Sequence, residues 1–375
     1  METFDVAIAG GGLIGAAIAL ELSQTGLRVG IFEHEQPGAG ASWAGAGILS
    51  PAPENSAMIA TVAIGRASLE LYPEFVAVVE EISGENVGYR AKGTLGLLFS
   101  GHAQAELSTI IALHHGLGLK AEPLNADDAR AMEPTLSDEI EAAVFRPDEA
   151  SVDNRALTKA TLNAAKQCGA KLFAGKRVMG ICKNHGRCTG LMVGDEKVES
   201  GWTVIAAGCR SGEISGVSRY APVRPAKGQM IALRRDAVKI ERVLWSDKVY
   251  LVPRNDGRIL VGATVEYVGF EKTVTAGAVE ALLRGAIDLA PELANAQIQE
   301  TWAGLRPDSP DHLPIIGATD VEGLLVATGH FRSGILLAPI TARLIREWIT
   351  RQSVALDWER FSPLRFVELG KATTQ

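Results

Sequence analysis

A glycine-rich turn close to the N-terminus places the strongest constraint on this chain. Gly10, Gly12 and Gly15 follow the pattern G-x-G-x-x-G, after a short apolar run at residues 6–9 and before an apolar stretch at residues 13–23. The run predicts a buried strand and the stretch predicts a helix. In that setting the first glycine permits a tight turn, the second lets the backbone approach a pyrophosphate, and the third lets helix and strand pack closely. The start of the chain therefore predicts a dinucleotide-binding site.

An acidic residue completes this unit. Residues 27–32 form the next predicted strand, and Glu33 follows it, about twenty residues after Gly10. A carboxylate at this point can bind both ribose hydroxyls and would repel a 2′-phosphate, which disfavours NADP. The alternative is a solvated carboxylate at the end of a strand. The motif alone does not decide between FAD and NAD.

Two later stretches favour FAD. Residues 204–208 end an apolar strand in a second glycine turn at Gly208, and residues 330–336 follow the last apolar run. In this interpretation residues 330–336 open the last helix, which is predicted from Ser333 to Thr350. A helix N-terminus directed at the N1–C2=O edge of a flavin would stabilise the negative charge that collects there on reduction. An ordinary strand–turn–helix with Ser333 as N-cap is the alternative.

A segment rich in glycine, alanine and serine lies at residues 38–53 and shows little helical or strand pattern. It could be a low-complexity linker. It could also be a loop that lies against a ligand, because glycine permits close backbone approach. Residues 58–82 then return to a helical pattern.

Pieces of the nucleotide-binding pattern recur along the chain, and β-rich stretches separate them. Residues 222–264 are rich in predicted strands, and Thr275 is placed to cap a helix at residues 276–289. We expect an α/β fold in which a Rossmann-like FAD-binding domain is interleaved with a mainly antiparallel β-sheet substrate domain. The predicted boundaries are 1–86, 146–218 and 302–375 for the discontinuous FAD-binding domain, and 87–145 and 219–301 for the substrate-binding domain.

Composition narrows the functional classes. The chain has 375 residues and a net charge of −7, and it has no run of basic residues with interleaved aromatics, which argues against nucleic acid as a partner. No secretory signal and no apolar run of about 18 residues is present, so we expect no membrane span. The four cysteines form no C-x-x-C pair, which favours free thiols and a cytoplasmic location. The sequence contains no cluster of histidines or cysteines of the kind that binds a metal ion, so we expect no metal site.

Taken together, these motifs resemble the D-amino-acid oxidase superfamily of flavoproteins, and within it the bacterial glycine oxidases linked to thiamine biosynthesis. The similarity covers nearly the whole chain. It rests on the first glycine turn with Glu33 and on four further stretches, at residues 44–49, 250–264, 302–307 and 329–339.

The resemblance implies which residues contact FAD. The first turn and the adenosine end would use Leu13, Ile14, Glu33 and His34, and Val178 would bind the adenine through its backbone. The pyrophosphate and flavin would be lined by Ala41, Ser42, Ala46, Gly47 and Ile48, and the pyrimidine edge of the flavin by His330, Phe331, Arg332, Ser333, Gly334, Ile335 and Leu336. Related sarcosine oxidases attach their flavin to a cysteine just after the arginine motif; residues 306–312 contain none, which implies non-covalent FAD.

The resemblance also implies substrate contacts. Arg306 matches an arginine that binds the substrate carboxylate bidentately, and a guanidinium suits this task better than an ammonium. Tyr250 matches a tyrosine that binds the same carboxylate, and Arg332 matches a position implicated in substrate binding. The alternatives are an ion pair for Arg306, a half-buried strand aromatic for Tyr250, and a structural or flavin-side arginine for Arg332. Trp245 replaces an expected tyrosine and Ile48 an expected methionine, which alters the shape of the pocket.

The implied activity is oxidative deamination of glycine or a small D- or N-methyl amino acid, with hydride transfer to FAD and oxygen as the acceptor. His330 could serve as a base, but backbone contact with the flavin is the preferred interpretation. The rival activity is a D-amino-acid or proline dehydrogenase that passes electrons to a quinone or another acceptor. Oxidation of a modified tRNA base and a non-catalytic flavin-binding role are further alternatives. The resemblance also allows a homo-oligomer, although the sequence has no interface signature.

Overall fold

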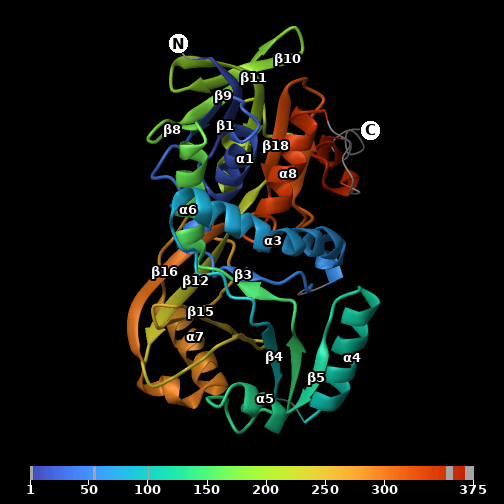
Figure 1. Cartoon of the computed structure of the whole chain (residues 1–375), viewed down its shortest axis with the longest axis vertical. Helices are drawn as coiled ribbons and strands as arrows, with labels where there is room; N and C mark the ends of the chain where they lie inside the picture. The colour runs from blue at the N-terminus through green and yellow to red at the C-terminus, as the bar shows by residue number, and fades with distance from the viewer. Residues whose placement is uncertain (1–2, 54–55, 100, 352–357, 368–375) are drawn as a thin grey trace.

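Two large sheets organise the chain (Figure 1). The computed structural model describes residues 3–53, 56–99, 101–351 and 358–367. The first sheet has eight strands, in the order β17-β18-β11-β1-β2-β8, and β10 pairs with β11 and with β9. Its strands are β1 (Phe4–Ala9), β2 (Val29–Phe32), β8 (Lys171–Phe173), β9 (Val178–Asn184), β10 (Arg187–Val193), β11 (Glu196–Ile205), β17 (Ile315–Ala318) and β18 (Leu324–Thr328).

The predicted strand–helix–strand unit at the N-terminus is confirmed. β1 pairs in parallel with β2 and with β11, and α1 (Leu13–Ser23) has the predicted bounds. A Cβ atom on Gly15 would lie 2.1 Å from the carbonyl oxygen of Gly10, so only glycine lets α1 pack this closely on the turn. Most of α1 is buried, because it packs against α6 (Asn154–Gln167) and α8 (Ala338–Ile349) as well as the sheet.

The predicted start of the last helix is wrong. Residues 334–337 form turns, and α8 begins only at Ala338, with Leu337 in the N-cap position and no side-chain cap. The alternative in which Ser333 caps this helix is therefore also wrong. Phe331, at φ 46°, and Gly329, at φ 69°, turn the chain sharply after β18, and the following turns delay the helix. Pro339 then lies in the first turn of α8, where its missing N–H costs no hydrogen bond.

The second sheet also has eight strands, in the order β16-β12-β15-β14-β13-β4-β6-β5. Its pairs are antiparallel except for β13 with β4, so the expected mainly antiparallel sheet is confirmed. Its strands are β4 (Thr94–Leu98), β5 (Glu122–Asn125), β6 (Ala142–Arg146), β12 (Arg224–Arg234), β13 (Val243–Trp245), β14 (Tyr250–Pro253), β15 (Arg258–Gly262) and β16 (Gln297–Asp308).

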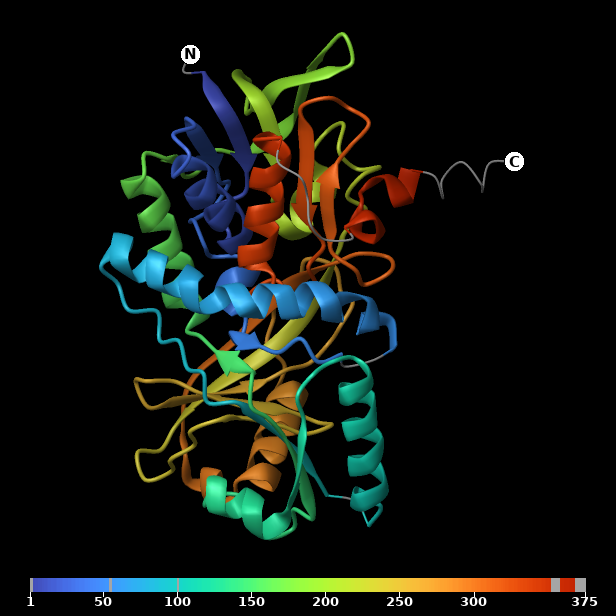
Figure 2. The same ribbon diagram turned by 45° about the vertical axis from the view of Figure 1, so that its right-hand side comes forward.

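Helices cover the second sheet and the junction between the sheets. α7 (Ala276–Leu289) has the predicted bounds, and the Thr275 hydroxyl accepts a hydrogen bond from the Ala278 N–H as its N-cap. α5 (Ala126–Met132) lies at the end of this sheet away from the first sheet, and α4 (Ala103–Gly116) runs beside the sheet next to β5 (Figure 1). α3 (Val62–Ser83) crosses the molecule between the two sheets (Figure 2). Short 3-10 turns are η1 (Ser56–Thr61), η2 (Gly208–Glu213), η3 (Pro291–Asn295) and η4 (Glu359–Phe361).

The segment at residues 38–53 crosses the junction as a loop with little regular structure. It contains the four-residue helix α2 (Ala41–Ala44) and the short strand β3 (Ile48–Leu49), which pairs with β7 (Ala150–Ser151). The proposed domain boundaries remain a proposal, and β16 crosses the boundary set at residue 302. No helix within the described ranges is long and apolar enough to cross a bilayer.

Candidate active site

A cavity of about 480 Å³ lies between the two sheets, and both contribute to its walls. Of the site residues predicted from the sequence, only Gly15 does not line it, because Gly15 packs α1 against the turn instead. The predicted residues that do line it are Gly10, Gly12, Leu13, Ile14, Glu33, His34, Ala41, Ser42, Ala46, Gly47, Ile48, Val178, Gly208, Tyr250, Arg306, His330, Phe331, Arg332, Ser333, Gly334, Ile335 and Leu336.

The glycine turn forms one end of the cavity. Gly10 has φ +112°, and a Cβ atom on it would lie 2.3 Å from the carbonyl oxygen of Ala206, so this position requires glycine. The N–H of Leu13, at the start of α1, donates to the Ser42 hydroxyl at 2.9 Å. This bond ties the loop of residues 38–53 to the helix N-terminus, where backbone N–H groups favour anions such as phosphates.

Glu33 is held firmly beside this turn. Its Oε2 atom accepts from the Gly11 N–H at 2.8 Å, and its Oε1 atom accepts from the Glu35 N–H at 2.9 Å. The Nδ1 atom of His34 lies 2.6 Å from the same Oε1 atom. The Glu33 side chain is only 12% exposed, so it is not the solvated carboxylate of the alternative interpretation. A carboxylate fixed at this edge still has acceptor capacity for ribose hydroxyls.

The lining fits a flavin dinucleotide. Gly40 and Gly208 both face the cavity, and a Cβ atom built on either would meet no protein atom within 4 Å, so the glycines keep open space that a ligand can occupy. The walls combine the N-terminus of α1, the Glu33 carboxylate and small apolar residues such as Ala44 and Ala46. These features suit a pyrophosphate, a ribose and a flat ring system, respectively.

The second sheet supplies the opposite wall. Strand pairing places Tyr250 opposite Gly262 and Met230 opposite Gly262 on its other side. The Tyr250 hydroxyl lies 3.3 Å from the Met230 sulfur. Burial raises the pKa of Tyr250, and the nearby Arg306 guanidinium opposes part of that rise. Tyr250 therefore remains a neutral hydrogen-bond donor close to a cation.

Arg306 is fixed by its backbone surroundings. Its Nη1 atom donates to the carbonyl oxygen of Thr264 at 3.0 Å. Gly228 lies beneath the guanidinium, and a Cβ atom there would come within 2.3 Å of Nη1. A guanidinium has five N–H donors, so one bond to Thr264 leaves donors for a ligand carboxylate. Arg306 and Tyr250 thus present a cation and a hydroxyl on the same wall.

Trp245 also belongs to this wall, and the state of its indole N–H was not predicted from the sequence. Its ring lies edge-to-face with Tyr250 at 5.2 Å between ring centroids, and it lines the cavity. Its Nε1 atom is buried and has no hydrogen-bond partner within the part of the chain that the structure describes. A buried donor of this kind costs free energy unless a ligand or water accepts from it. The one signal that could have placed Trp245 on this wall is its pairing with Tyr250 on the neighbouring strand.

The segment at residues 330–336 closes the side of the cavity. His330 is buried, its Nε2 atom lies 3.0 Å from the Thr341 hydroxyl oxygen, and burial lowers the pKa of His330 to about 3. The imidazole is therefore neutral near pH 7, and it is a poor proton acceptor. Burial also lowers the pKa of Arg332, whose guanidinium lies 5.5 Å from the Phe331 ring centroid.

Cys209 also lines the cavity, although no sequence motif predicts it there. Its sulfur donates to the carbonyl oxygen of Leu305 at 3.3 Å, and burial raises the pKa of the thiol to about 12. A thiol with this pKa is protonated near neutral pH and is a weak nucleophile, which does not favour a covalent bond to flavin. Among the described residues, no group of three or more His, Cys, Asp or Glu side chains is placed to hold a metal ion.

Fold and cavity define a dinucleotide-binding α/β protein in which the second sheet contributes the Arg306 guanidinium to the cavity wall. Residues 5–348 match the family model described as DAO, FAD dependent oxidoreductase. The chain belongs to this family, and the expected FAD cofactor and D-amino-acid oxidase resemblance are confirmed.

Individual relatives extend this result. The chain is 33% identical over 369 residues to Glycine oxidase of Geobacillus kaustophilus, and the match covers 97% of each chain. The crystal structure of glycine oxidase from that organism matches with a TM-score of 0.91 and covers 96% of this chain and 98% of that one. This chain is 36% identical to Bifunctional protein ThiO/ThiG of Trichormus variabilis, and the match covers 99% of this chain. The chain spans about half of that relative, 56% of its length. The crystal structure of L-proline dehydrogenase from P. horikoshii matches with a TM-score of 0.86 at 25% identity, covering 98% of each chain.

Proposed function

We propose that this chain is an amino-acid oxidase that deaminates glycine or a small D- or N-methyl amino acid. The products would be a keto acid, which is glyoxylate from glycine, with ammonia or an amine and hydrogen peroxide. The observation that carries the proposal is that Arg306 and Tyr250 line the same cavity as the dinucleotide turn. The relatives named glycine oxidase support it. Non-covalent FAD, oxygen as acceptor and a cytoplasmic location are parts of the same proposal.

In this proposal Arg306 and Tyr250 bind the substrate carboxylate. The guanidinium supplies the charge, and the neutral Tyr250 hydroxyl donates a second hydrogen bond. Two contacts at one end of a small amino acid fix the direction of its α-carbon, and such orientation accounts for much of the rate of a reaction between two bound partners. Trp245 and Ile48 limit the space left for a side chain, since both line the cavity.

Bound FAD supplies a hydride acceptor at its N5 atom and passes the electrons on to oxygen. The glycine turn, Glu33 and the segments at residues 41–48 and 330–336 would hold it. The substrate amine gives up its proton to water before it reacts, because the neutral, buried His330 is a poor acceptor near pH 7. Loss of hydride from the α-carbon leaves an imino acid, which water hydrolyses to the keto acid and ammonia.

Anaerobic titration of the purified yellow protein tests this function. Glycine, sarcosine, D-alanine and D-proline are added in turn, and bleaching of the visible flavin absorbance is recorded. We expect at least one of them to bleach the flavin and, in air, to give hydrogen peroxide in equal amount to the keto acid. Turnover with a dye but no peroxide would support a dehydrogenase instead. A flavin that none of the four reduces would contradict the proposed substrate class.

The carboxylate-binding role predicts the behaviour of Arg306→Ala. Loss of a charge-assisted contact should raise the KM for glycine about 10- to 100-fold, because such contacts are worth about 1.5–3 kcal/mol. FAD should remain bound, as judged by the visible spectrum. Arg224→Ala is the matched control, since this exposed arginine lies on β12 and pairs with Asp308. An unchanged KM in Arg306→Ala would mean that the carboxylate binds elsewhere.

A further inference from the structure

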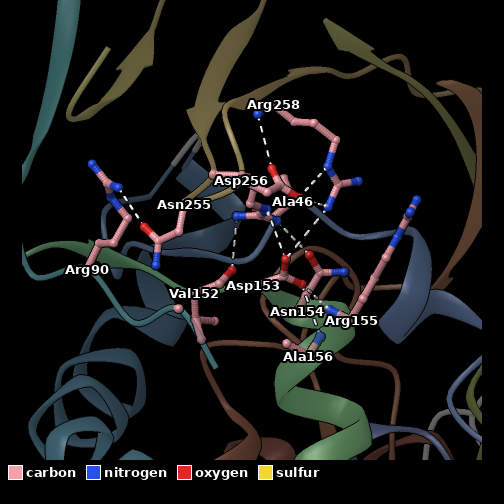
Figure 3. A network of polar contacts seen from close by, with 12 residues as sticks. Ala46, Arg90, Val152, Asp153, Asn154, Arg155, Ala156, Asn255, Asp256 and Arg258 are labelled. Atoms are coloured by element: carbon pink, nitrogen blue, oxygen red, sulfur yellow. Dashed lines mark hydrogen bonds and ion pairs between the residues drawn. The ribbon is translucent and has the colours of Figure 1, made fainter. Parts of the chain in front are cut away.

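Arg254 is a buried cation between the two sheets, and it is not among the residues predicted from the sequence to form the site. Only 7% of it is exposed. Its Nη2 atom donates to the carbonyl oxygen of Ala46 at 2.9 Å and to Oδ1 of Asn154 at 2.7 Å, and its Nη1 atom donates to the carbonyl oxygen of Val152 at 3.1 Å. Asp153 is 3.8 Å away. Figure 3 shows Ala46, Val152, Asp153 and Asn154 gathered at this point.

Four side chains hold the loop that lines the cavity at Ala41–Ile48. One of them is Arg155, whose Nε atom donates to the carbonyl oxygen of Trp43 at 3.3 Å. Besides Arg254 on Ala46, the Asn154 amide donates to the carbonyl oxygens of Ser42 and Trp43, at 2.7 and 3.0 Å. The indole N–H of Trp302 donates to the carbonyl oxygen of Ala44 at 3.0 Å. Carbonyl oxygens engaged in this way are not free to face the phosphates or the ring of a bound nucleotide. The network therefore fixes the shape of the cavity wall.

Arg254 also belongs to the hairpin that carries Tyr250. It follows β14 directly, and its N–H donates to the carbonyl oxygen of Arg258 at 2.8 Å, which closes the turn into β15. Tyr250 begins the same strand and lines the cavity. One short hairpin thus carries Tyr250 of the cavity wall at one end and contacts the Ala41–Ile48 loop at the other.

We propose that Arg254 is a positioning residue that fixes the Ala41–Ile48 loop against the Tyr250 hairpin and so sets the alignment of the flavin with the bound amino acid. This rests on the proposed function. A planar guanidinium can bridge two carbonyls and an amide at fixed angles, whereas an ammonium cannot. Displacement of reacting groups by about 1 Å can cost about 100-fold in rate. A role confined to overall stability would leave the rate at saturating substrate unchanged.

Two variants of Arg254 and a control on the same hairpin test this proposal. Arg254→Lys keeps the charge, and Arg254→Gln removes it. Arg258→Gln removes an equal charge from the same hairpin. Arg258 pairs with the side chains of Asp256, Asp153 and Glu300, and within the described residues its side chain makes no hydrogen bond to residues 41–48. The measurements are the rate of anaerobic flavin reduction at saturating glycine, the KM, the Kd for FAD, and hydrogen exchange of residues 41–48.

We expect Arg254→Lys to lower the rate of flavin reduction about 10- to 100-fold, with a KM within about threefold of the wild type. Exchange of residues 41–48 should become faster, and the Kd for FAD should rise. Arg258→Gln should match the wild type in all four measurements. If Arg254→Gln fails to fold, Arg254→Lys decides the question.

A wild-type rate in Arg254→Lys would overturn the proposal, and so would a lower rate with unchanged exchange of residues 41–48. Failure of the proposed function gives a different result, because then no amino acid reduces the wild-type flavin. In that case the hydrogen exchange of residues 41–48 and the Kd for FAD still decide whether Arg254 positions the Ala41–Ile48 loop.

Discussion

Glu149 is an ionisable residue that lies almost completely out of contact with solvent. It is 4% exposed, and its two carboxyl oxygens accept hydrogen bonds from the Ser50 and Thr94 hydroxyls, each at 2.5 Å. Burial raises the pKa of Glu149. Because the folded protein then holds the proton more tightly than the unfolded chain, stability should fall as pH rises from the unfolded pKa of about 4.3 through the folded value.

Glu149→Gln should remove this pH dependence. The amide keeps the shape of the carboxyl group, and both hydroxyls can rotate to match its donors. We expect the free energy of unfolding of the variant to fall less than that of the wild type between about pH 4 and pH 8. Urea unfolding at a series of pH values measures the difference. Parallel curves for the two proteins would show that Glu149 ionises in the folded state as it does in the unfolded chain.

At this scale the sequence predicts residues whose role is set by neighbours in the chain. Gly10 and Glu33 belong to one short unit, so their placement follows from a local pattern. Glu149 and Arg254 were missed because their partners are far away in the sequence: Ser50 is 99 residues from Glu149, and Ala46 is 208 residues from Arg254. No local pattern links residues at such separations.

Among the elements, α1 and α7 were predicted with correct bounds and α8 was not. α1 begins at the glycine turn and α7 has a threonine cap, which are local signals. α8 follows a segment whose shape depends on contact with other parts of the chain. The Phe331 N–H, for example, donates to the carbonyl oxygen of Pro307 at 2.9 Å. Tertiary contacts of this kind delayed the helix without leaving a mark in its sequence.

The close packing of α1 on its turn predicts the effect of Gly15→Ala. The added Cβ atom would lie 2.1 Å from the Gly10 carbonyl oxygen, a backbone atom that cannot move alone. We expect α1 to shift, stability to fall by about 3 kcal/mol or more, and FAD to be lost. Urea unfolding and the visible absorbance of the purified protein measure the two effects.

Gly277→Ala is the matched control for Gly15→Ala. Gly277 also lies in the first turn of a helix, α7, but a Cβ atom there would meet no atom within 4 Å. Alanine has a higher helix propensity, so this variant should be as stable as the wild type or more stable by up to about 1 kcal/mol. Equal loss of stability in both variants would show that glycine is needed in helices here for reasons other than close packing.

For the whole molecule, the interleaving of the two sheets was predicted from recurring motifs and from the family resemblance. Spacing alone could not give it, because each sheet is assembled from segments far apart in the chain. β4 pairs with β13, for example, although α6 and four strands of the first sheet, β8 to β11, lie between them in sequence. The cavity exists only where these segments meet, so its full lining could not be listed from the sequence.

Because walls from both sheets line one cavity, FAD should stabilise the molecule as a unit. At a free FAD concentration of 100 times Kd, binding should add about 2.7 kcal/mol to the free energy of unfolding. FMN and ADP each match only part of the cavity, so at equal concentration each should raise the Tm of the apoprotein less than FAD does. Hydrogen exchange with FAD bound should slow both at the glycine turn of residues 10–15 and along β14. Protection confined to the glycine turn would mean that the cofactor does not reach the second sheet. A substrate bound at Arg306 would then have no flavin close enough to accept its hydride.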